Sequence, residues 1–167
     1  MKTVVGVYLG ESAVPVGDLT FVADRGKEAC QFAYATSWLE SADRFEIDPA
    51  LPLSPGHHFP QGKAVLFGCF MDCAPDGWGE MVINRDRRKR GVTTPATSLD
   101  MLLEIHDGSR MGALRFSADR GKTFLADPGP DARKAPPLIE LKDLLRAATA
   151  IDKDTETADD LRLLLRR

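Results

Sequence analysis

The chain has 167 residues, of which 43% are hydrophobic and 28% are charged, and its formal net charge is −3. These values are typical of one globular domain with a hydrophobic core, with room for a short additional segment. A slightly acidic chain has no overall excess of cations, so nucleic-acid binding would require a local basic cluster.

The sequence favours a cytoplasmic location. Its first three residues lead directly into a strand-like pattern, without the apolar region of a secretory signal. No apolar run approaches the roughly 20 residues that a membrane-spanning helix needs, so no membrane partner is expected. Cys30, Cys69 and Cys73 lack the spacing of zinc ligands and are expected to be buried, reduced thiols.

The first part of the chain predicts an antiparallel meander. β-Branched and aromatic residues favour one strand over residues 4–9 and a second over residues 14–22. Pro15 has no N–H to donate, which favours an edge position for the second strand. Alternating residues over 30–34 predict a third strand with one aromatic face, and the turns between the three strands are short.

A proline-rich segment follows the predicted sheet. Trp38 lies just before it, and residues 50–56 contain too many prolines for a helix, which favours an extended path along a sheet edge. His57 and His58 have no neighbouring cysteine or carboxylate, so we expect solvent-exposed side chains rather than ligands or bases. A hydrolase that uses either histidine with Asp72 is an alternative, but no nucleophile motif accompanies them.

An apolar run, a sharp turn and a charged stretch then follow in succession. The run over residues 64–73 favours a buried helix that ends at Pro75. Asp76 and Gly77 supply the turn. Trp78 begins a second helix, and its side chain is expected to pack inward with the apolar residues one turn later.

A basic cluster ends this second helix and comprises Arg85, Arg87, Arg88, Lys89 and Arg90. Cations near the C-terminal end of a helix are favoured by its dipole, so a solvated last turn explains the cluster. The functional alternative is a patch for an acidic protein surface or for phosphates. A nucleic-acid-binding regulator that uses residues 85–90 is weakened by Asp86 and by the lack of aromatic residues for base stacking.

The stretch before the next boundary carries two local signals. Thr97 and Asp100 are spaced as in a capping box that begins a short, leucine-lined helix. Residues 111–117 alternate as a strand, with Gly112 on its apolar face. Residues 108–112 lack the lysine and the flanking helix of a phosphate-binding loop, and they predict the turn into this strand.

Residues 126–137, ADPGPDARKAPP, form the clearest boundary in the chain. This linker separates a β-rich domain (1–125) from a helical segment (138–167), in which residues 157–160 match a second capping box. The apolar stripes of that segment are Leu138, Leu141, Leu144, Leu145 and Ala148, and then Leu161, Leu164 and Leu165. The predicted class is α+β: a small antiparallel sheet or barrel-like domain with short flanking helices, followed by helices.

Five stretches resemble, in order and spacing, the N-terminal region of HipA-family serine/threonine kinases, toxins of bacterial toxin–antitoxin systems. The stretches are residues 31–34 with Trp38 and Leu39, 50–54, 70–72 with 75–78, 99–105 and 109–116. This chain has Cys73 and Ala74 where asparagine and leucines commonly precede the Pro-Asp pair. The residues to which we assign a motif or structural role are Trp38, Pro75, Asp76, Gly77, Trp78, Asp100 and Gly112.

The resemblance implies an antiparallel β-barrel-like subdomain that packs on an α-helical kinase lobe, in the same chain or in a separate one. It also implies a helix-turn-helix antitoxin as partner, so that DNA is contacted only indirectly. ATP and Mg²⁺ are implied for the kinase lobe, whose catalytic residues lie downstream of this region in the family. We therefore expect a non-catalytic, regulatory part of a type II toxin kinase, without catalytic, cofactor-binding or metal-binding residues of its own. The partner-binding hypothesis rests on Arg85, Arg87, Arg88 and Arg110.

Overall fold

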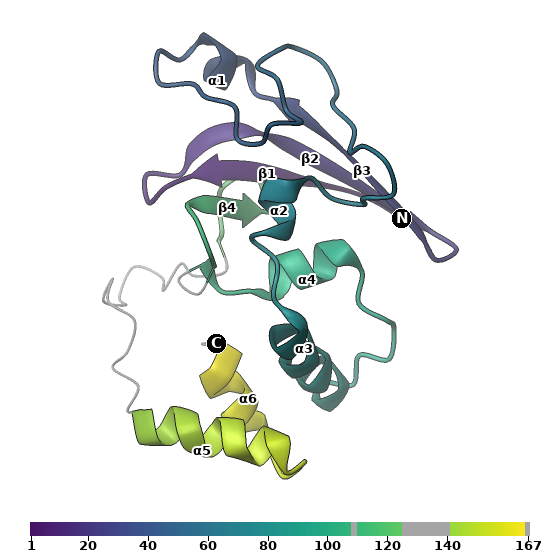
Figure 1. Cartoon of the computed structure of the whole chain (residues 1–167), viewed down its shortest axis with the longest axis vertical. Helices are drawn as coiled ribbons and strands as arrows, with labels where there is room; N and C mark the ends of the chain where they lie inside the picture. The colour runs from purple at the N-terminus through teal and green to yellow at the C-terminus, as the bar shows by residue number, and fades with distance from the viewer. Residues whose placement is uncertain (108–109, 125–140, 166–167) are drawn as a thin grey trace.

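The computed structural model describes residues 1–107, 110–124 and 141–165, and Figure 1 shows their arrangement. The strands are β1 (Lys2–Leu9), β2 (Val14–Asp24), β3 (Lys27–Tyr34) and β4 (Leu114–Ser117). The helices are α1 (Thr36–Glu40), α2 (Gly68–Met71), α3 (Gly77–Lys89), α4 (Ser98–Glu104), α5 (Leu141–Asp152) and α6 (Ala158–Leu165). The sheet lies at one end of the molecule and α5 and α6 lie at the other, and the α+β class is confirmed.

The strands form one sheet in the order β3-β2-β1-β4, with every neighbouring pair antiparallel. The first three strands follow one another along the chain, which confirms the predicted meander. β4 joins the other edge of β1 from far along the sequence, with Ser117 opposite Gly6. It begins at Leu114 rather than at Met111, and Gly112 before it has a φ of 81°, a conformation that favours glycine.

The edge position expected for the strand with Pro15 is wrong, because β2 lies between β3 and β1. Pro15 is tolerated there for two reasons. It pairs with Tyr8 next to a register shift between Val7 and Tyr8, where the ladder is irregular. It also lies beyond the last pair with β3, in which Gly17 is opposite Tyr34, so its missing N–H breaks no regular ladder.

One face of the sheet carries the hydrophobic core. Alternate residues of β3, Cys30, Phe32 and Tyr34, are buried, which confirms the predicted aromatic face. Phe70 of α2 is fully buried against them, and its ring centroid lies 5.6 Å from that of Phe32 and 5.9 Å from that of Phe116. Burial of these large side chains between the sheet and the short helices supplies most of the driving force for folding.

Only one helical turn, α2, forms in the run that predicted a helix over residues 64–73. The buried carboxylate of Asp48 fixes its start, because Oδ2 accepts a hydrogen bond of 2.7 Å from the N–H of Cys69. The other oxygen, Oδ1, accepts one of 2.8 Å from the N–H of Ala50. Phe67, just before the turn, has an extended backbone and is 2% exposed, so part of the run is buried without a longer helix, while Met71 is 51% exposed.

The proline-rich segment reaches the β3 edge of the sheet at His58 rather than over residues 50–56. Phe32 and His58 exchange two backbone hydrogen bonds, of 2.9 and 2.8 Å. The expected exposure is confirmed for His57 and wrong for His58, which is half-buried. The ring nitrogen Nε2 of His58 lies 3.2 Å from the carbonyl oxygen of Ser54, so a local contact explains this side chain.

Two residues that were assigned structural roles have clear local functions. Trp38 is 3% exposed, and its indole N–H donates to the carbonyl oxygen of Phe45 at 3.3 Å. The capping box of α4 is confirmed: Thr97 Oγ1 accepts from the N–H of Asp100, and Asp100 Oδ2 accepts from the N–H of Thr97. Leu99 and Leu102 of this helix are buried, as the leucine stripe predicted.

The free thiols give a test of the core. Burial raises the pKa of Cys30 to about 11 and also raises the pKa values of Cys69 and Cys73. We expect the native protein at neutral pH to react with Ellman's reagent at least about tenfold more slowly than a free thiol, because the thiolate is the reactive form. In guanidinium chloride all three should react at once, and one rapidly titrating thiol in the native protein would contradict this packing.

Candidate partner-binding surface

The turn at Pro75 positions the candidate surface at the start of α3. Asp76 is the N-cap of this helix, and its Oδ1 accepts a hydrogen bond of 2.8 Å from the N–H of Gly79. This cap satisfies one of the free N–H groups at the helix start. Glu80 lies in the first turn, where a negative charge is favoured by the helix dipole. Asp76, expected in the turn, is therefore the N-cap, and Gly77, also expected in the turn, is the first residue of α3.

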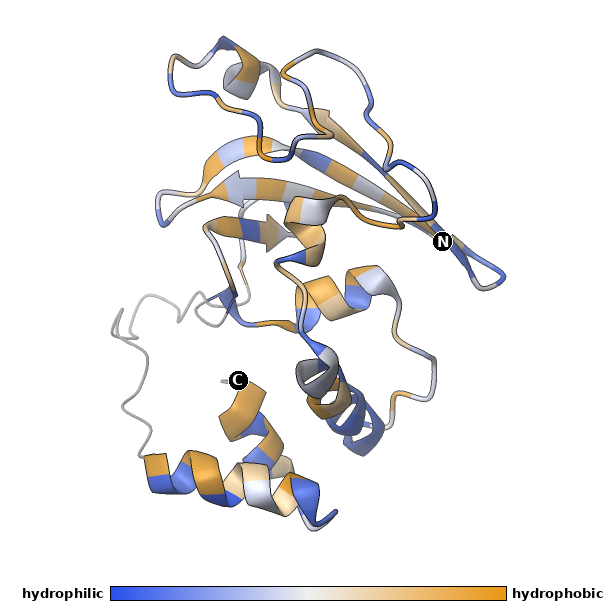
Figure 2. Ribbon diagram, viewed as in Figure 1, coloured by the Kyte–Doolittle hydropathy of each residue, from blue (hydrophilic) through white to orange (hydrophobic). Residues whose placement is uncertain are grey.

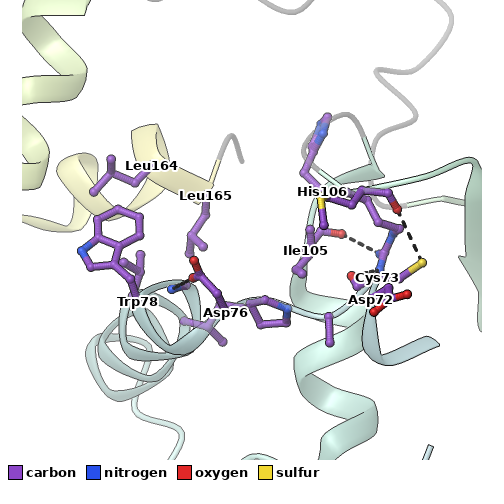
Figure 3. Close-up of a pocket in the computed structure, with 15 residues that line it drawn as sticks. Asp72, Cys73, Asp76, Trp78, Ile105, His106, Leu164 and Leu165 are labelled. Atoms are coloured by element: carbon purple, nitrogen blue, oxygen red, sulfur yellow. Dashed lines mark hydrogen bonds between the residues drawn. The ribbon is translucent and has the colours of Figure 1, made fainter. Parts of the chain in front are cut away.

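The inward packing expected for Trp78 is wrong, because 45% of the residue is exposed. The buried residues of α3 begin one turn later, with Val82 and Ile83. Figure 3 shows Trp78 beside Leu164 of α6, so the first turn of α3 faces the C-terminal helices instead of the sheet domain. These helices leave almost half of the indole exposed.

Arg85 and Lys89, in the basic cluster, bind the connection between α5 and α6. Arg85 Nη1 donates to the carbonyl oxygen of Ile151 at 2.9 Å and to Glu156 Oε2 at 3.0 Å. Its Nη2 lies 2.7 Å from Asp154 Oδ1. Lys89 Nζ donates to the carbonyl oxygen of Glu156 and lies 3.6 Å from its Oε1. These two cations therefore hold the C-terminal helices on α3.

Arg87 and Arg90, from the same cluster, connect α3 to α4. Arg87 is 8% exposed; its Nη1 donates to Glu104 Oε1 at 3.3 Å and its Nη2 to the carbonyl oxygen of Thr94 at 3.4 Å. Arg90 Nη2 lies 3.1 Å from Glu104 Oε2, and its Nε lies 2.7 Å from Asp86 Oδ2. Figure 2 shows this hydrophilic end of α3, where most of the positive charge is matched within the chain.

Arg88 differs from its neighbours in the basic cluster. It is exposed, and its side chain forms no ion pair or hydrogen bond with any residue in the described ranges 1–107, 110–124 and 141–165. Of the candidate partner-binding residues, Arg88 is thus the one whose guanidinium group is open to a partner. Partner binding by Arg85 and Arg87 stays a prediction, and both would have to exchange their present contacts to take part.

Arg110, the fourth candidate, lies in the interior. Its Nη1 donates to the carbonyl oxygens of Cys73 at 3.2 Å and Leu102 at 2.9 Å, and its Nη2 donates to that of Ile105 at 3.0 Å. The guanidinium carbon lies 4.7 Å from the ring centroid of Phe116. The structure thus places Arg110 where it joins the ends of α2 and α4 to β4, away from the other three candidates.

The α5–α6 hairpin builds a second apolar cluster on α3. Ile151 and Leu161 are fully buried against Val82, which is 1% exposed. Of the stripe predicted for α5, Leu144 and Ala148 are half-buried, whereas Leu141 and Leu145 are 80% and 65% exposed. Ala147 and Ile151, four residues apart, face the partner helices instead, since small Ala147 permits a close approach. The predicted linker 126–137 and Leu138 lie outside the described residues.

A pocket of about 380 Å³ opens between these two parts of the molecule. Its walls come from the turn and first half of α3, from the segment after α4, and from the end of α6 (Figure 3). Leu164 and Leu165, predicted as part of an apolar stripe, line it, and so do residues that no sequence pattern indicated: Val82, Ile83, Ile105, His106 and Met111. Asp72 also lines it, whereas His57 and His58 do not, so the described residues give no support to the hydrolase alternative.

The sheet, its covering helices and the docked α5–α6 hairpin define a small α+β protein with an apolar pocket on α3. Residues 6–117 match the family model described as the HipA N-terminal domain, which is more than half of the chain. The chain therefore belongs to the HipA N-terminal domain family. A search of curated proteins finds no match.

Two negative observations concern the described residues only. Residues 1–107, 110–124 and 141–165 contain no group of three or more His, Cys, Asp or Glu side chains that could hold a metal ion. No helix within these ranges has the length and apolar character needed to cross a membrane.

The contacts of Arg85 predict that Arg85→Ala loosens the α5–α6 hairpin. The loss of a partly buried guanidinium that binds two carboxylates and a carbonyl should speed amide hydrogen exchange over residues 141–165 about three- to tenfold. Arg88→Ala is the matched control, because this exposed arginine has no such contacts within the described residues. Equal exchange in the two variants, measured by mass spectrometry, would contradict the assigned role of Arg85.

The N-terminus of α6 predicts a loss of stability in acid. The backbone N–H of Thr157, then its hydroxyl, and Arg146 hold the pKa of Asp160 below its usual value, so folding favours the ionised form. The contribution of the Asp160 carboxylate to the free energy of unfolding is therefore present above about pH 4 and is lost as the pH falls through the lowered pKa. In denaturant titrations between pH 6 and 2.5, Asp160→Asn should flatten the decline. Asp159→Asn, at an exposed neighbour, should not.

Proposed function

We propose that this chain is the non-catalytic, protein-interaction part of a HipA-like toxin serine/threonine kinase of a type II toxin–antitoxin system. It docks on a kinase lobe, in the same chain or in a separate one, on a helix-turn-helix antitoxin, or on both. The observation that carries this proposal is the match of residues 6–117 to the HipA N-terminal domain. The protein would act in the bacterial cytoplasm, and ATP and Mg²⁺ would be bound by the kinase lobe.

The exposed apolar side chains around α3 support a role in protein binding. Trp78 is 45% exposed and Met111 is 73% exposed, and both line the same pocket. Apolar patches of this kind mark interaction sites on soluble proteins, and tryptophan is enriched among the residues that contribute most to binding. Arg88, on the same helix, adds an exposed cation to the surface.

The alternative of direct nucleic-acid binding by residues 85–90 receives less support. Arg85, Arg87, Lys89 and Arg90 are already paired with carboxylates of this chain. Phosphate binding by these cations would require those ion pairs to break, and only the exposed Arg88 would act without that penalty. Contact with DNA through the antitoxin is therefore the simpler proposal.

Two assays test the proposed function. The purified chain with ATP and Mg²⁺ should incorporate no phosphate, and robust incorporation would refute a non-catalytic role. The chain should bind the isolated kinase lobe of a HipA-type kinase, or its antitoxin, in calorimetry. Trp78→Ala should weaken that binding tenfold or more, as is roughly typical of a buried interface tryptophan.

Phe59→Ala is the matched control for Trp78→Ala. Phe59 is 62% exposed but belongs to the proline-rich segment beside β3 and does not line the pocket. Its replacement should leave the affinity unchanged. Failure to bind both the kinase lobe and the antitoxin, or binding to duplex DNA that weakens steeply with salt, would favour the nucleic-acid alternative.

A further inference from the structure

The pocket combines an apolar interior with an acidic mouth. Val82 and Ile83 of α3, Ile105 after α4, and Leu164 and Leu165 of α6 supply apolar surface from three separate elements. A cavity of about 380 Å³ is within the size range of pockets that take up a ligand or a large side chain. Figure 3 shows Trp78 and His106 on opposite sides of the pocket.

The exposed charges at the mouth are carboxylates. Asp72 and Asp76 are both exposed and line the pocket, and neither forms an ion pair with a residue of the described ranges. The one arginine in the lining, Arg110, has a side chain that is 1% exposed and donates to three carbonyl oxygens. A ligand in the pocket can therefore reach exposed carboxylates but not the guanidinium group of Arg110.

We infer that this pocket is the docking site for an apolar side chain that a partner protein presents between basic residues. The apolar side chain enters the pocket and is removed from water, while the flanking lysines or arginines meet Asp72 and Asp76. An acidic segment is disfavoured by the same two carboxylates. This inference rests on the proposed function, because it specifies which kind of partner segment would bind at the interaction surface.

Occupation of the pocket is coupled to the position of the α5–α6 hairpin. Leu164 and Leu165 form one wall, and this wall is in place while the hairpin stays docked on α3 through Arg85, Lys89 and the apolar cluster with Val82. A ligand that contacts both walls stabilises the docked hairpin, and the docked hairpin raises the affinity for the ligand by the same factor.

A short capped peptide with a leucine between two arginines is a suitable probe. The chain contains two tryptophans, so the indole N–H signals in a nitrogen-15 NMR spectrum give a reporter and an internal control. The signal of Trp78, at the pocket, should shift on titration, and the signal of Trp38, 3% exposed in the core, should not. A peptide with asparagine in place of leucine, and one with glutamates in place of the arginines, should leave both signals unchanged.

Variants of the protein test the charge contacts at the mouth separately from the apolar contact inside the pocket. Asp72→Asn with Asp76→Asn should weaken probe binding roughly five- to tenfold, because two exposed charge pairs are lost while asparagine still caps α3. Asp152→Asn, at an exposed carboxylate on α5 outside the pocket lining, is the matched control and should have no effect. Met111→Lys, which adds a cation at the mouth, should weaken binding at least as much as the double variant.

The outcomes distinguish this inference from the proposed function. Binding of the probe without binding of a kinase lobe or antitoxin would support the pocket and refute the proposed function. Binding of those partners with no shift of Trp78 by the probe, or with equal affinity for the acidic peptide, would overturn the pocket chemistry alone. A Trp78 signal that moves with protein concentration in the absence of peptide would show that a second copy fills the pocket and would also overturn it.

Discussion

The arrangement of the short helices depends on the contacts of one side chain, the guanidinium group of Arg110. It donates to carbonyl oxygens at the end of α2 and at the end of α4, and it stacks on Phe116 of β4. A buried carbonyl without a donor is destabilising by about 1 to 3 kcal/mol, so few other side chains could hold these chain ends together. Its Nε lies 3.5 Å from Asp107 Oδ1, and neither atom has a hydrogen-bond partner among the described residues.

The basic cluster of α3 connects two hydrophobic clusters that otherwise share little. Arg87 and Arg90 bind Glu104 on the side of the sheet domain, and Arg85 binds Glu156 on the side of the C-terminal hairpin. The helix dipole explains why cations are favoured at this end, but it does not select these partners. The selection follows from helix geometry: Arg85 and Lys89, four residues apart, share one side of α3, and Arg87 and Arg90, three apart, share another. One short run of cations can therefore serve two interfaces.

The features that were predicted correctly depend on neighbours in the sequence, and those that were missed depend on distant ones. The capping box of Thr97 and Asp100 and the alternation of β3 need only residues a few positions apart, and both are confirmed. The exposure of Trp78 depends on where α6 docks, about 80 residues later, and no local pattern encodes that contact. The interior position of β2, which corrects the expectation for Pro15, depends on the pairing of β3 with β2 as well as of β1 with β2.

The same distinction between local and distant contacts explains why the sequence did not predict the pocket. The family match ends at residue 117, at the end of β4, whereas the wall formed by Leu164 and Leu165 belongs to the hairpin beyond it. Neither part is a binding site alone, because the turn at Pro75 offers one apolar wall and α6 offers the other. A leucine pair near the end of an amphipathic helix predicts burial but not the surface on which it is buried. In the hairpin, Ile151 and Leu161 are the residues that form the buried contact with α3. The remaining leucines are therefore available to line a surface, and the carboxylates of Asp72 and Asp76 at its mouth determine the charge of a segment that can bind there.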